Sequence, residues 1–151
     1  MRLILMPIIC GFIATTGMTA FLYAVNQTGW TNSDMVRAIG SMLTKSHKNS
    51  LGVGLIVHFL NGIIIAAVYL HILSLLALSN FALETFLGGC IGFAQGFVVS
   101  WAIVRFAYRH PVEVFQKADY KVAVVHHAAH VIYGLLIGAV FGLLRISGYG
   151  F

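Results

Sequence analysis

Hydrophobic positions run through this chain in four long blocks separated by shorter polar segments. The blocks cover about residues 3–25, 51–77, 83–104 and 122–144, and each is apolar on every side. A helix needs about 20 apolar residues to cross the roughly 30 Å hydrocarbon core of a bilayer, and each block is that long. Membrane strands would instead alternate apolar and polar residues and close into a barrel. The pattern therefore predicts an all-α membrane protein whose four spanning helices form a bundle.

The composition supports the same class. Of the 151 residues, 60% are hydrophobic and 9% are charged, and the mean hydropathy is +0.93. A soluble domain needs a more charged surface than this. The first block is too long for the apolar core of a signal peptide, so we interpret it as a true span. We expect residues 1–151 to form a single integral membrane domain.

A short amphipathic segment lies in the connection between the first two blocks. Ser33 is a suitable N-cap, and Trp30 beside it suits the headgroup region. The pattern predicts an interfacial helix over about residues 33–44, which either covers the floor of the bundle or contacts lipid or a partner. Its apolar positions recur at three- and four-residue spacing: Met35, Val36, Ile39, Met42 and Leu43.

The distribution of basic residues predicts the orientation. Seven of the nine Lys and Arg residues lie in the first and third connections between blocks: Arg37, Lys45, Lys48, Arg105, Arg109, Lys117 and Lys121. The positive-inside bias places both connections in the cytoplasm and both chain ends on the opposite side. The sequence pI of about 9.5 then reflects contact with anionic headgroups. We therefore expect membrane lipid, and not nucleic acid, as the partner of these charges.

The second and fourth blocks contain similar segments. VHFLNGIIIAAVY in one matches AHVIYGLLIGAVF in the other, which pairs His58 with His130 and Gly62 with Gly134. The first and third blocks also match, as CGFIATTGMTA and CIGFAQGFVVS, with one extra residue after the second cysteine, so that Gly11 pairs with Gly92. We therefore predict two pseudo-repeated two-helix units. Each unit crosses the membrane twice, so the units share one orientation and are related by an axis along the membrane normal.

Small residues recur at four-residue steps in the spans. Lipid is as apolar as leucine, so spanning helices associate mainly where small residues allow their backbones to approach closely. These rows are therefore expected to form the helix-packing surfaces. The predicted packing residues are Gly11, Thr15, Gly88, Gly92, Gly96, Gly138 and Gly142.

Histidines continue two of these rows, and an imidazole inside a membrane normally faces protein or a cavity. His58 and His130 each lie about 10 Å inside the cytoplasmic boundary, and Gly62 and Gly134 follow one turn later. Two such imidazoles could be the axial ligands of a b-type haem, with the glycines leaving room for the macrocycle. Adding His126 would give a three-imidazole site for zinc, copper or iron. The alternative is structural: packing glycines, with each imidazole hydrogen-bonded to a carbonyl or to Asn61, Tyr133 or Gln95.

Other polar positions near the opposite boundary suggest less specific roles. His71 and Glu84 fall close to the second connection, where they either pair or are solvated separately. Cys10 and Cys90 each lie seven residues in from that boundary, at a different level from the histidines. We expect both cysteines to act as small packing residues.

The order of these segments resembles a family of small four-span bacterial membrane proteins of unknown function. The resemblance covers Met1 to about Leu144, and its most specific points are the two His-x-x-x-Gly motifs, His58 with Gly62 and His130 with Gly134. It implies a four-helix fold in the bacterial inner membrane and implies no activity. The segments that carry it are GFIATTGMTAFL, DMVRAIGSML, GLIVHFLNGIIIAAVY, GGCIGFAQGFVVSWAIV and HHAAHVIYGLLIGAVFGLL.

The sequence favours a protein that acts by binding. We find no nucleophile placed with a base, no phosphate loop and no paired acids in the spans, so we expect no enzyme. The main hypothesis is an accessory subunit that packs within a larger respiratory, photosynthetic or oxidase-type membrane complex, through other subunits or through self-association. One alternative is an electron-transfer protein with haem b on His58 and His130. Another is a small transporter or channel, which would need a dimer because four spans leave little room for a pathway.

Overall fold

The computed structural model describes residues 2–76 and 80–149, and every element in these ranges is helical. Four of the helices are long and apolar enough to cross a membrane, which confirms the predicted four-span bundle. The predicted end of the second span at Ala77 lies outside the described residues. The helices are α1 (Arg2–Gln27), α2 (Met35–Thr44), α3 (Ser50–Leu75), α4 (Phe81–Phe106), α5 (Glu113–Gln116) and α6 (Tyr120–Leu144), with short turns η1 (Ala107–Arg109) and η2 (Arg145–Tyr149).

Polar side chains mark where the later spans begin. The Asn80 side chain accepts a hydrogen bond from the Leu83 amide at 3.1 Å, and the Asp119 carboxylate accepts one from the Lys121 amide at 3.0 Å. Both side chains satisfy amide groups that the first turn of a helix leaves unpaired. With 26 residues, α3 and α4 are each about 39 Å long, which exceeds the thickness of the hydrocarbon core.

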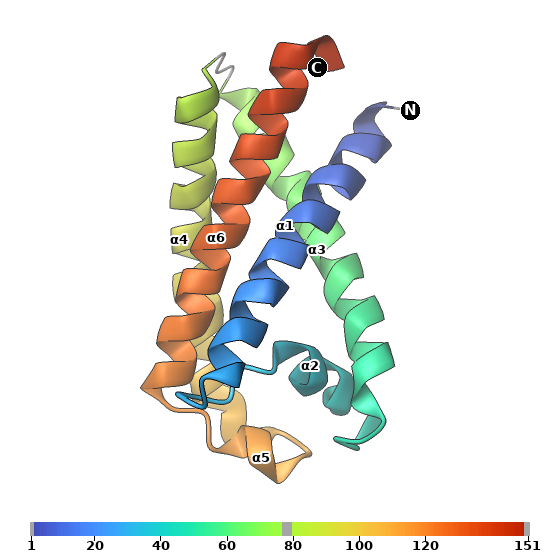
Figure 1. Cartoon of the computed structure of the whole chain (residues 1–151), viewed down its shortest axis with the longest axis vertical. Coiled ribbons are helices and arrows are strands. Elements are labelled where there is room, and N and C mark those ends of the chain that lie inside the picture. The colour runs from blue at the N-terminus through green and yellow to red at the C-terminus, as the bar shows by residue number, and fades with distance from the viewer. Residues whose placement is uncertain (1, 77–79, 150–151) are drawn as a thin grey trace.

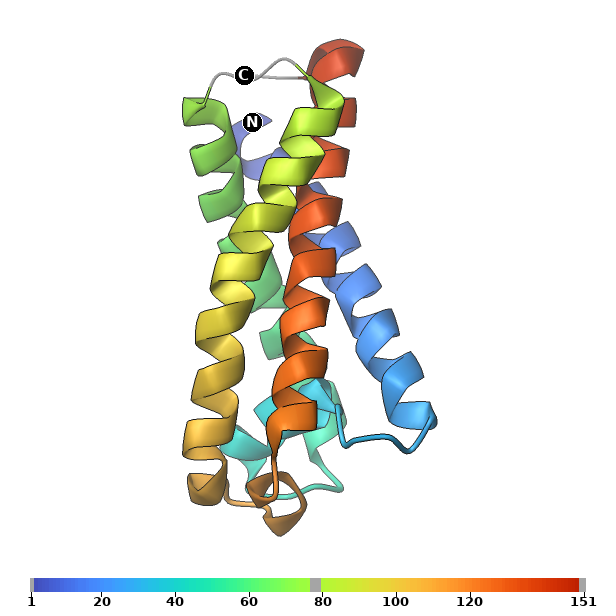
Figure 2. The same ribbon diagram turned by 90° about the vertical axis from the view of Figure 1, so that its left-hand side faces the viewer.

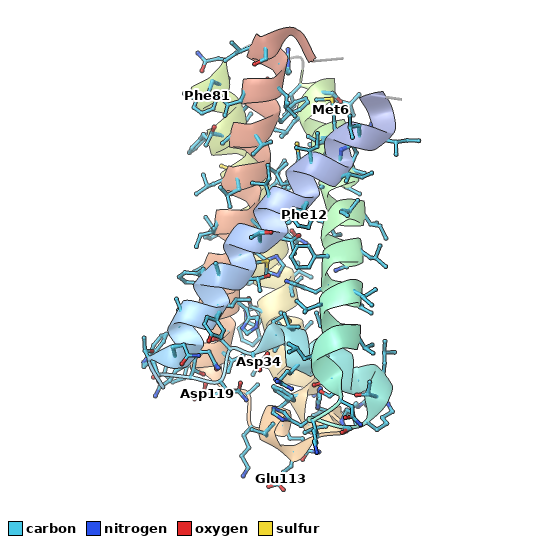
Figure 3. The ribbon with its side chains drawn as sticks, turned by 45° about the vertical axis from the view of Figure 1, so that its right-hand side comes forward. Met6, Phe12, Asp34, Phe81, Glu113 and Asp119 are labelled. Atoms are coloured by element: carbon cyan, nitrogen blue, oxygen red, sulfur yellow. The ribbon has the colours of Figure 1, made fainter. Side chains whose placement is uncertain are left out.

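The four spans run alternately up and down, so α1 begins and α6 ends at the same end of the bundle (Figure 1). We call this the terminal end, and we call the opposite end, which carries α2 and α5, the basic end. Met6 and Phe81 lie at the terminal end, whereas Asp34, Glu113 and Asp119 lie at the basic end (Figure 3). The seven basic residues of the first and third connections are therefore gathered at one end of the molecule.

The spans do not pack evenly. Helices α4 and α6 lie side by side along their length, while α1 crosses α3 and also packs on α6 (Figures 1 and 2). Helix α3 makes only slight contact with α4 and α6. The apolar core consequently lies where α1, α3 and α6 meet, and it includes Cys10, Ala14, Leu70, Leu73, Ile137 and Phe141.

The two pairs of repeated spans use matching glycine contacts. A Cβ atom added to Gly11 in α1 would lie 3.1 Å from the Gly62 carbonyl oxygen in α3. A Cβ atom added to Gly92 in α4 would lie 3.2 Å from the Gly134 Cα in α6. The sequence alignment pairs Gly11 with Gly92 and Gly62 with Gly134, so each two-helix unit is closed by the same pair of small residues.

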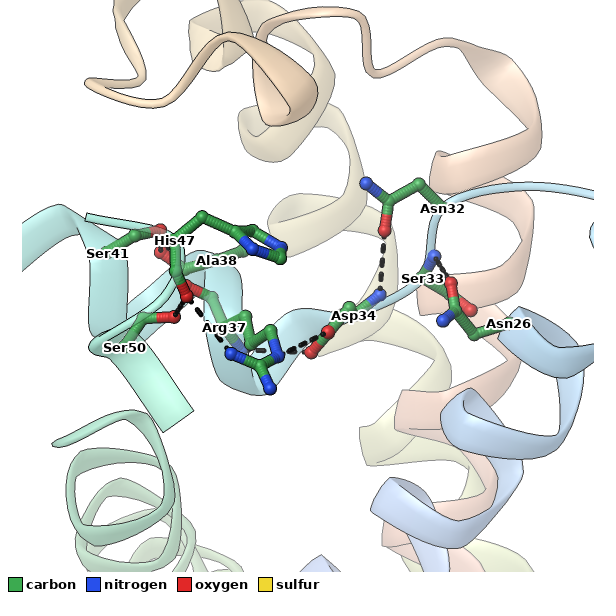
Figure 4. Close-up of polar contacts among 9 residues, drawn as sticks. All are labelled: Asn26, Asn32, Ser33, Asp34, Arg37, Ala38, Ser41, His47 and Ser50. Atoms are coloured by element: carbon green, nitrogen blue, oxygen red, sulfur yellow. Dashed lines mark hydrogen bonds and ion pairs between the residues drawn. The ribbon is translucent and has the colours of Figure 1, made fainter. Parts of the chain in front are cut away.

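Helix α2 has the predicted type and nearly the predicted bounds, but its N-cap is Asp34 and not Ser33. The Asp34 carboxylate accepts from the Arg37 amide at 3.0 Å. The Ser33 hydroxyl instead donates to the Leu22 carbonyl of α1 at 2.8 Å, and the Ser33 amide donates to the Asn26 side chain at 3.1 Å. Ser33 therefore fastens the start of α2 to the end of α1 (Figure 4).

The other side of α2 is fastened to α3. The Arg37 guanidinium donates to the His47 carbonyl at 3.0 Å, and the Ser50 hydroxyl donates to the same oxygen at 2.7 Å (Figure 4). Backbone contact is also close, because a Cβ atom on Gly40 would meet the Ser50 carbonyl and one on Gly54 would meet the Val36 carbonyl. Helix α2 therefore packs on the start of α3 as a fixed part of the basic end.

Candidate functional site

His58 lies buried on α3 and contacts α1. Its Nε2 atom is 3.1 Å from the Thr19 hydroxyl, and that hydroxyl also donates to the Thr15 carbonyl at 2.6 Å. A carbonyl only accepts, so the hydroxyl hydrogen is used in the second bond. Both bonds form together when His58 carries its proton on Nε2 and donates it to Thr19. His58 thus links α3 to α1.

His126 and His130 lie buried one turn apart on α6. The Nδ1 atom of His126 is 2.8 Å from the Val122 carbonyl, so Nδ1 carries the proton and, in the neutral ring, Nε2 is an acceptor. His130 differs, because neither ring nitrogen has a hydrogen-bond partner. It packs against α4, where a Cβ atom on Gly96 would lie 2.9 Å from the His130 Cβ.

His58, His126 and His130 are all buried side chains of the spanning helices. The stripes in the sequence correctly placed all three inside the bundle. The two repeated units nevertheless use them differently. His58 is bonded to Thr19, whereas His130 and Ser100, the residue aligned with Thr19, both have buried polar atoms without a partner.

The two glycines predicted to leave room for a haem lie at helix contacts. A Cβ atom on Gly62 would meet the Thr15 hydroxyl, and one on Gly134 would meet the Gly88 carbonyl. The neighbouring helix therefore fills the space beside each glycine. His58 also uses its Nε2 atom to bond Thr19. The geometry thus supports helix packing as the role of these two glycines, whereas haem ligation by His58 and His130 stays a prediction.

The three-imidazole metal site stays a prediction. Within the described ranges 2–76 and 80–149, no group of three or more His, Cys, Asp or Glu side chains is arranged so that it could hold a metal ion.

Two tyrosines complete the polar interior. The Tyr133 hydroxyl of α6 donates to the Gly62 carbonyl of α3, and the Tyr69 hydroxyl of α3 donates to the Gln95 side chain of α4, each at 2.5 Å. The two rings pack edge to face with centroids 5.6 Å apart. These bonds connect α3 to α6 and α4 across the side where helix packing is slight. The sequence suggested Tyr133 and Gln95 only as partners for the histidines, and this tyrosine role was missed.

The predicted packing residues lie at helix contacts. Cβ atoms on Gly88 and Gly92 would meet the carbonyls of Gly134 and His130, and one on Gly138 would meet the Glu84 carbonyl. Nothing larger than hydrogen fits at these positions unless the helices move apart. Thr15 fills the corresponding space beside Gly62 in the other unit.

A buried ion pair closes the terminal end. The Glu84 carboxylate of α4 accepts from the Arg145 guanidinium at 2.6 Å, and the Glu84 side chain is only 2% exposed. Arg145 also lies over the Phe141 ring, with its Cζ 5.7 Å from the centroid. The pairing of Glu84 with His71 that the sequence allowed is not formed, because His71 is exposed on α3 and Arg145 follows directly on α6, the helix against which α4 packs.

The cysteines have different surroundings. Cys10 is completely buried in the core, as a packing residue would be, whereas Cys90 is exposed on α4. Both are free thiols. The signal that separates them is the one-residue insertion after Cys90, which rotates it by about 100° relative to the packing row of its helix.

A cavity of about 640 Å³ lies at the basic end, between α2 and the adjoining ends of α4, α5 and α6. Its wall is mostly apolar, with several aromatic side chains, and two imidazoles line it, those of His110 and His126. His110 helps to hold this region together, because its Nε2 donates to the Ala38 carbonyl of α2 at 3.0 Å while Nδ1 accepts from the Val112 amide at 3.1 Å. The sequence gave His110 no role, and only the folded arrangement brings it next to α2.

Comparison with known proteins identifies a family for the chain but gives no activity. No curated protein and no solved structure matches it. The match to a family covers residues 1–147, nearly the whole chain, and it confirms the resemblance that the two His-x-x-x-Gly motifs indicated. The chain therefore belongs to the family of unknown function DUF6789.

Proposed function

We propose that this protein acts by binding, as a small accessory subunit that packs against a spanning helix of another membrane protein in the bacterial inner membrane. The observation that carries the proposal is Asn61, a carboxamide on the exposed face of α3 with no hydrogen-bond partner among the described residues. A polar group in this position needs a partner that the chain itself does not supply.

Asn61 lies well inside the hydrocarbon region. It is 11 residues from the start of α3 at Ser50 and 14 from its end at Leu75, or about 16 and 21 Å along the axis. Lipid offers no hydrogen bonds at that depth, so an unpaired amide is costly. An asparagine that bonds across to a second helix removes this cost and contributes about 1 kcal/mol to association.

The exposed hydroxyl groups of Thr16 and Thr85 in the spans are already satisfied. Thr16 donates to the Phe12 carbonyl at 2.8 Å, and Thr85 donates to the Phe81 carbonyl at 2.9 Å, each within its own helix. A carboxamide has two donors and an acceptor, which its own helical backbone cannot fully satisfy. Asn61 is therefore a better candidate for an intermolecular contact than these hydroxyls.

The packing around α3 favours the same surface. Helix α3 is held by α1 and α2 but makes only slight contact with α4 and α6, and Asn61 lies on its exposed face. Beyond the spans, the described chain consists of short connections and the small helices α2 and α5. This favours a protein that works through its membrane-embedded surface.

The orientation follows from charge. Because the basic end carries seven of the nine Lys and Arg residues, we propose that it faces the cytoplasm and that both chain ends face the other side. A reporter that is active only outside the cytoplasm, fused after α6, should be active, and the same reporter inserted between α2 and α3 should be inactive. The opposite pair of results would reverse the orientation without changing the fold.

The accessory role can be tested by photo-crosslinking in native membranes. A benzoyl-phenylalanine placed at Asn61 should join the chain to a second, different protein, and mass spectrometry would identify that protein. Asn61→Val should reduce co-migration with it in mild detergent by about fivefold, which corresponds to one lost hydrogen bond. Thr16→Val is the matched control and should leave co-migration unchanged.

Two results would reject this proposal. A crosslinked product of twice the chain mass, without another protein, would mean self-association. Crosslinking to lipid alone, with the protein at native abundance, would mean that Asn61 faces the bilayer in the working molecule.

A further inference from the structure

The cavity at the basic end has the properties of a small-molecule site that is separate from the Asn61 surface. Its volume of about 640 Å³ is within the range of about 300–1,000 Å³ that ligand pockets occupy. Apolar side chains from α2, α4 and α6 form its wall, including Ile39, Ile103 and Val122. Such a wall matches an apolar ligand body and binds it by removing it from water.

His126 supplies the polar contact inside this apolar wall. It lies six residues after the start of α6, or about 9 Å along the helix, and it is only 3% exposed. Because Nδ1 donates to the Val122 carbonyl, the neutral ring presents its Nε2 lone pair, which has no partner among the described residues. A group bound here must therefore donate a hydrogen bond to His126, so a hydroxyl suits it and a bare carbonyl does not.

Most of the charged side chains that line the cavity are already engaged elsewhere. The carboxylates of Asp34 and Asp119 also line it, but each caps the first turn of a helix, α2 or α6. Lys117 pairs with Glu113 at 3.2 Å, with both side chains largely in solvent. His110 also lines the cavity, but both of its ring nitrogens are already bonded, whereas Nε2 of His126 is not bonded within the described part of the chain.

We propose that this cavity binds a membrane-soluble, hydroxyl-bearing aromatic molecule of the phenol or hydroquinone class. The apolar ring packs between α2, α4 and α6, and its hydroxyl donates to His126 Nε2. Aromatic side chains at the wall, among them Trp30, Phe106 and Phe115, suit a flat ring. The site does not depend on the accessory role, because it lies at the basic end and Asn61 lies near the middle of α3.

Trp30 allows binding to be measured directly. It lines the cavity, whereas the second tryptophan, Trp101, is 64% exposed on α4 and does not line it. In a Trp101→Phe background, quenching of Trp30 fluorescence therefore reports occupancy. The reverse variant, Trp30→Phe, keeps Trp101 alone and measures simple partitioning of the probe into detergent or lipid.

Three probes of similar shape separate hydroxyl recognition from apolar binding. They are tetramethylhydroquinone, which donates, and tetramethylbenzoquinone and the dimethyl ether of the hydroquinone, which do not. Under anaerobic conditions the hydroquinone should bind about fivefold more tightly than the other two, the value of one buried hydrogen bond. His126→Phe should keep apolar binding and lose this preference.

Other results would reject the proposal or one of its parts. Equal binding of all three probes would reject recognition through a hydroxyl, and a preference retained in His126→Phe would reject His126 as the acceptor. If His126→Phe does not fold, Ala102→Phe provides a second test, because Ala102 lines the cavity from α4 and a ring there should abolish quenching of Trp30. Unchanged quenching in Ala102→Phe, or no quenching by any probe in the parent protein, would reject the site.

Discussion

At the scale of single residues, the bond between His58 and Thr19 should contribute measurably to stability. Thr19→Val removes the acceptor and leaves a buried imidazole N–H unpaired, so we expect a loss of about 1 kcal/mol in the free energy of unfolding. Unfolding by sodium dodecyl sulfate in mixed micelles, followed by circular dichroism, measures this loss. Thr19→Ser keeps the hydroxyl and should recover most of it.

Thr16→Val is the control for this change, because the Thr16 hydroxyl is exposed and bonds within its own helix. It should shift unfolding by less than about 0.5 kcal/mol. A double variant with His58→Phe then isolates the pair. If Thr19→Val costs as much in the His58→Phe background as in the parent, the two side chains are not coupled.

The two partners of the ion pair between Glu84 and Arg145 should differ in how much their removal destabilises the protein. Removing Arg145 leaves a carboxylate that is only 2% exposed without its partner, whereas removing Glu84 leaves a guanidinium that is 25% exposed and can turn toward water. Arg145→Ala should therefore destabilise the protein more than Glu84→Ala, by about 1–3 kcal/mol. The same detergent unfolding measures both variants, and equal losses would show that Glu84 also reaches water.

The sequence allowed some of these residue roles to be predicted and concealed others. Four-residue spacing places His58 and His130 inside the bundle, because residues one turn apart share a helix face. It does not predict that Thr19 faces His58, since that depends on how α1 rotates against α3. The partner of Glu84 is 61 residues away, and it becomes visible only when α4 and α6 are known to lie side by side.

At the scale of elements, glycines with and without a facing helix should respond to substitution in opposite directions. A Cβ atom on Gly138 would press on the Glu84 backbone of α4, so Gly138→Ala should separate α4 from α6 and cost about 1–3 kcal/mol. Gly52 on α3 has open space where its Cβ would lie. Gly52→Ala should be neutral, or stabilising by up to about 1 kcal/mol, because alanine favours helix.

Detergent unfolding of these two glycine variants gives the comparison directly. The sign of each change in the free energy of unfolding matters more than its size, because helix propensity alone would make both substitutions stabilising. Stabilisation by Gly138→Ala would show that α4 and α6 are not in backbone contact in the membrane.

For helix α2, the sequence predicted the element but not its exact start. Its apolar spacing predicts the helix, and the structure places it at Met35–Thr44 against the expected 33–44. The start differs because Ser33 is used for a contact with α1. The sequence alone could not indicate this, since Ser and Asp are comparable N-caps and only the position of the Leu22 carbonyl decides between them.

At the scale of the whole molecule, hydropathy predicted the four spans, and their alternating course puts both termini at one end. The lateral order of the helices was not predictable. Every span is apolar all round and carries small residues, so no face of α3 marks it as the helix that packs least on the others. The repeated contacts of Gly11 with Gly62 and of Gly92 with Gly134 explain how each unit closes on itself. They do not explain how the two units join.

The joint between the units is α1 against α6, and this gives a test of the whole architecture. Ala14 of α1 is completely buried in the core that includes Ala129, Tyr133 and Ile137 of α6. Each span is stable alone in a bilayer, so a chain divided between α3 and α4 should reassemble when both parts are co-expressed, and one tagged part should recover the other. Ala14→Leu should reduce that recovery severalfold, because the added atoms have no space at the joint. Ala20→Leu adds the same atoms to an exposed position of α1 and should have no effect. Equal recovery with Ala14→Leu would mean that the units are joined through α3 and its bonds from Tyr69 and Tyr133, and not through α1.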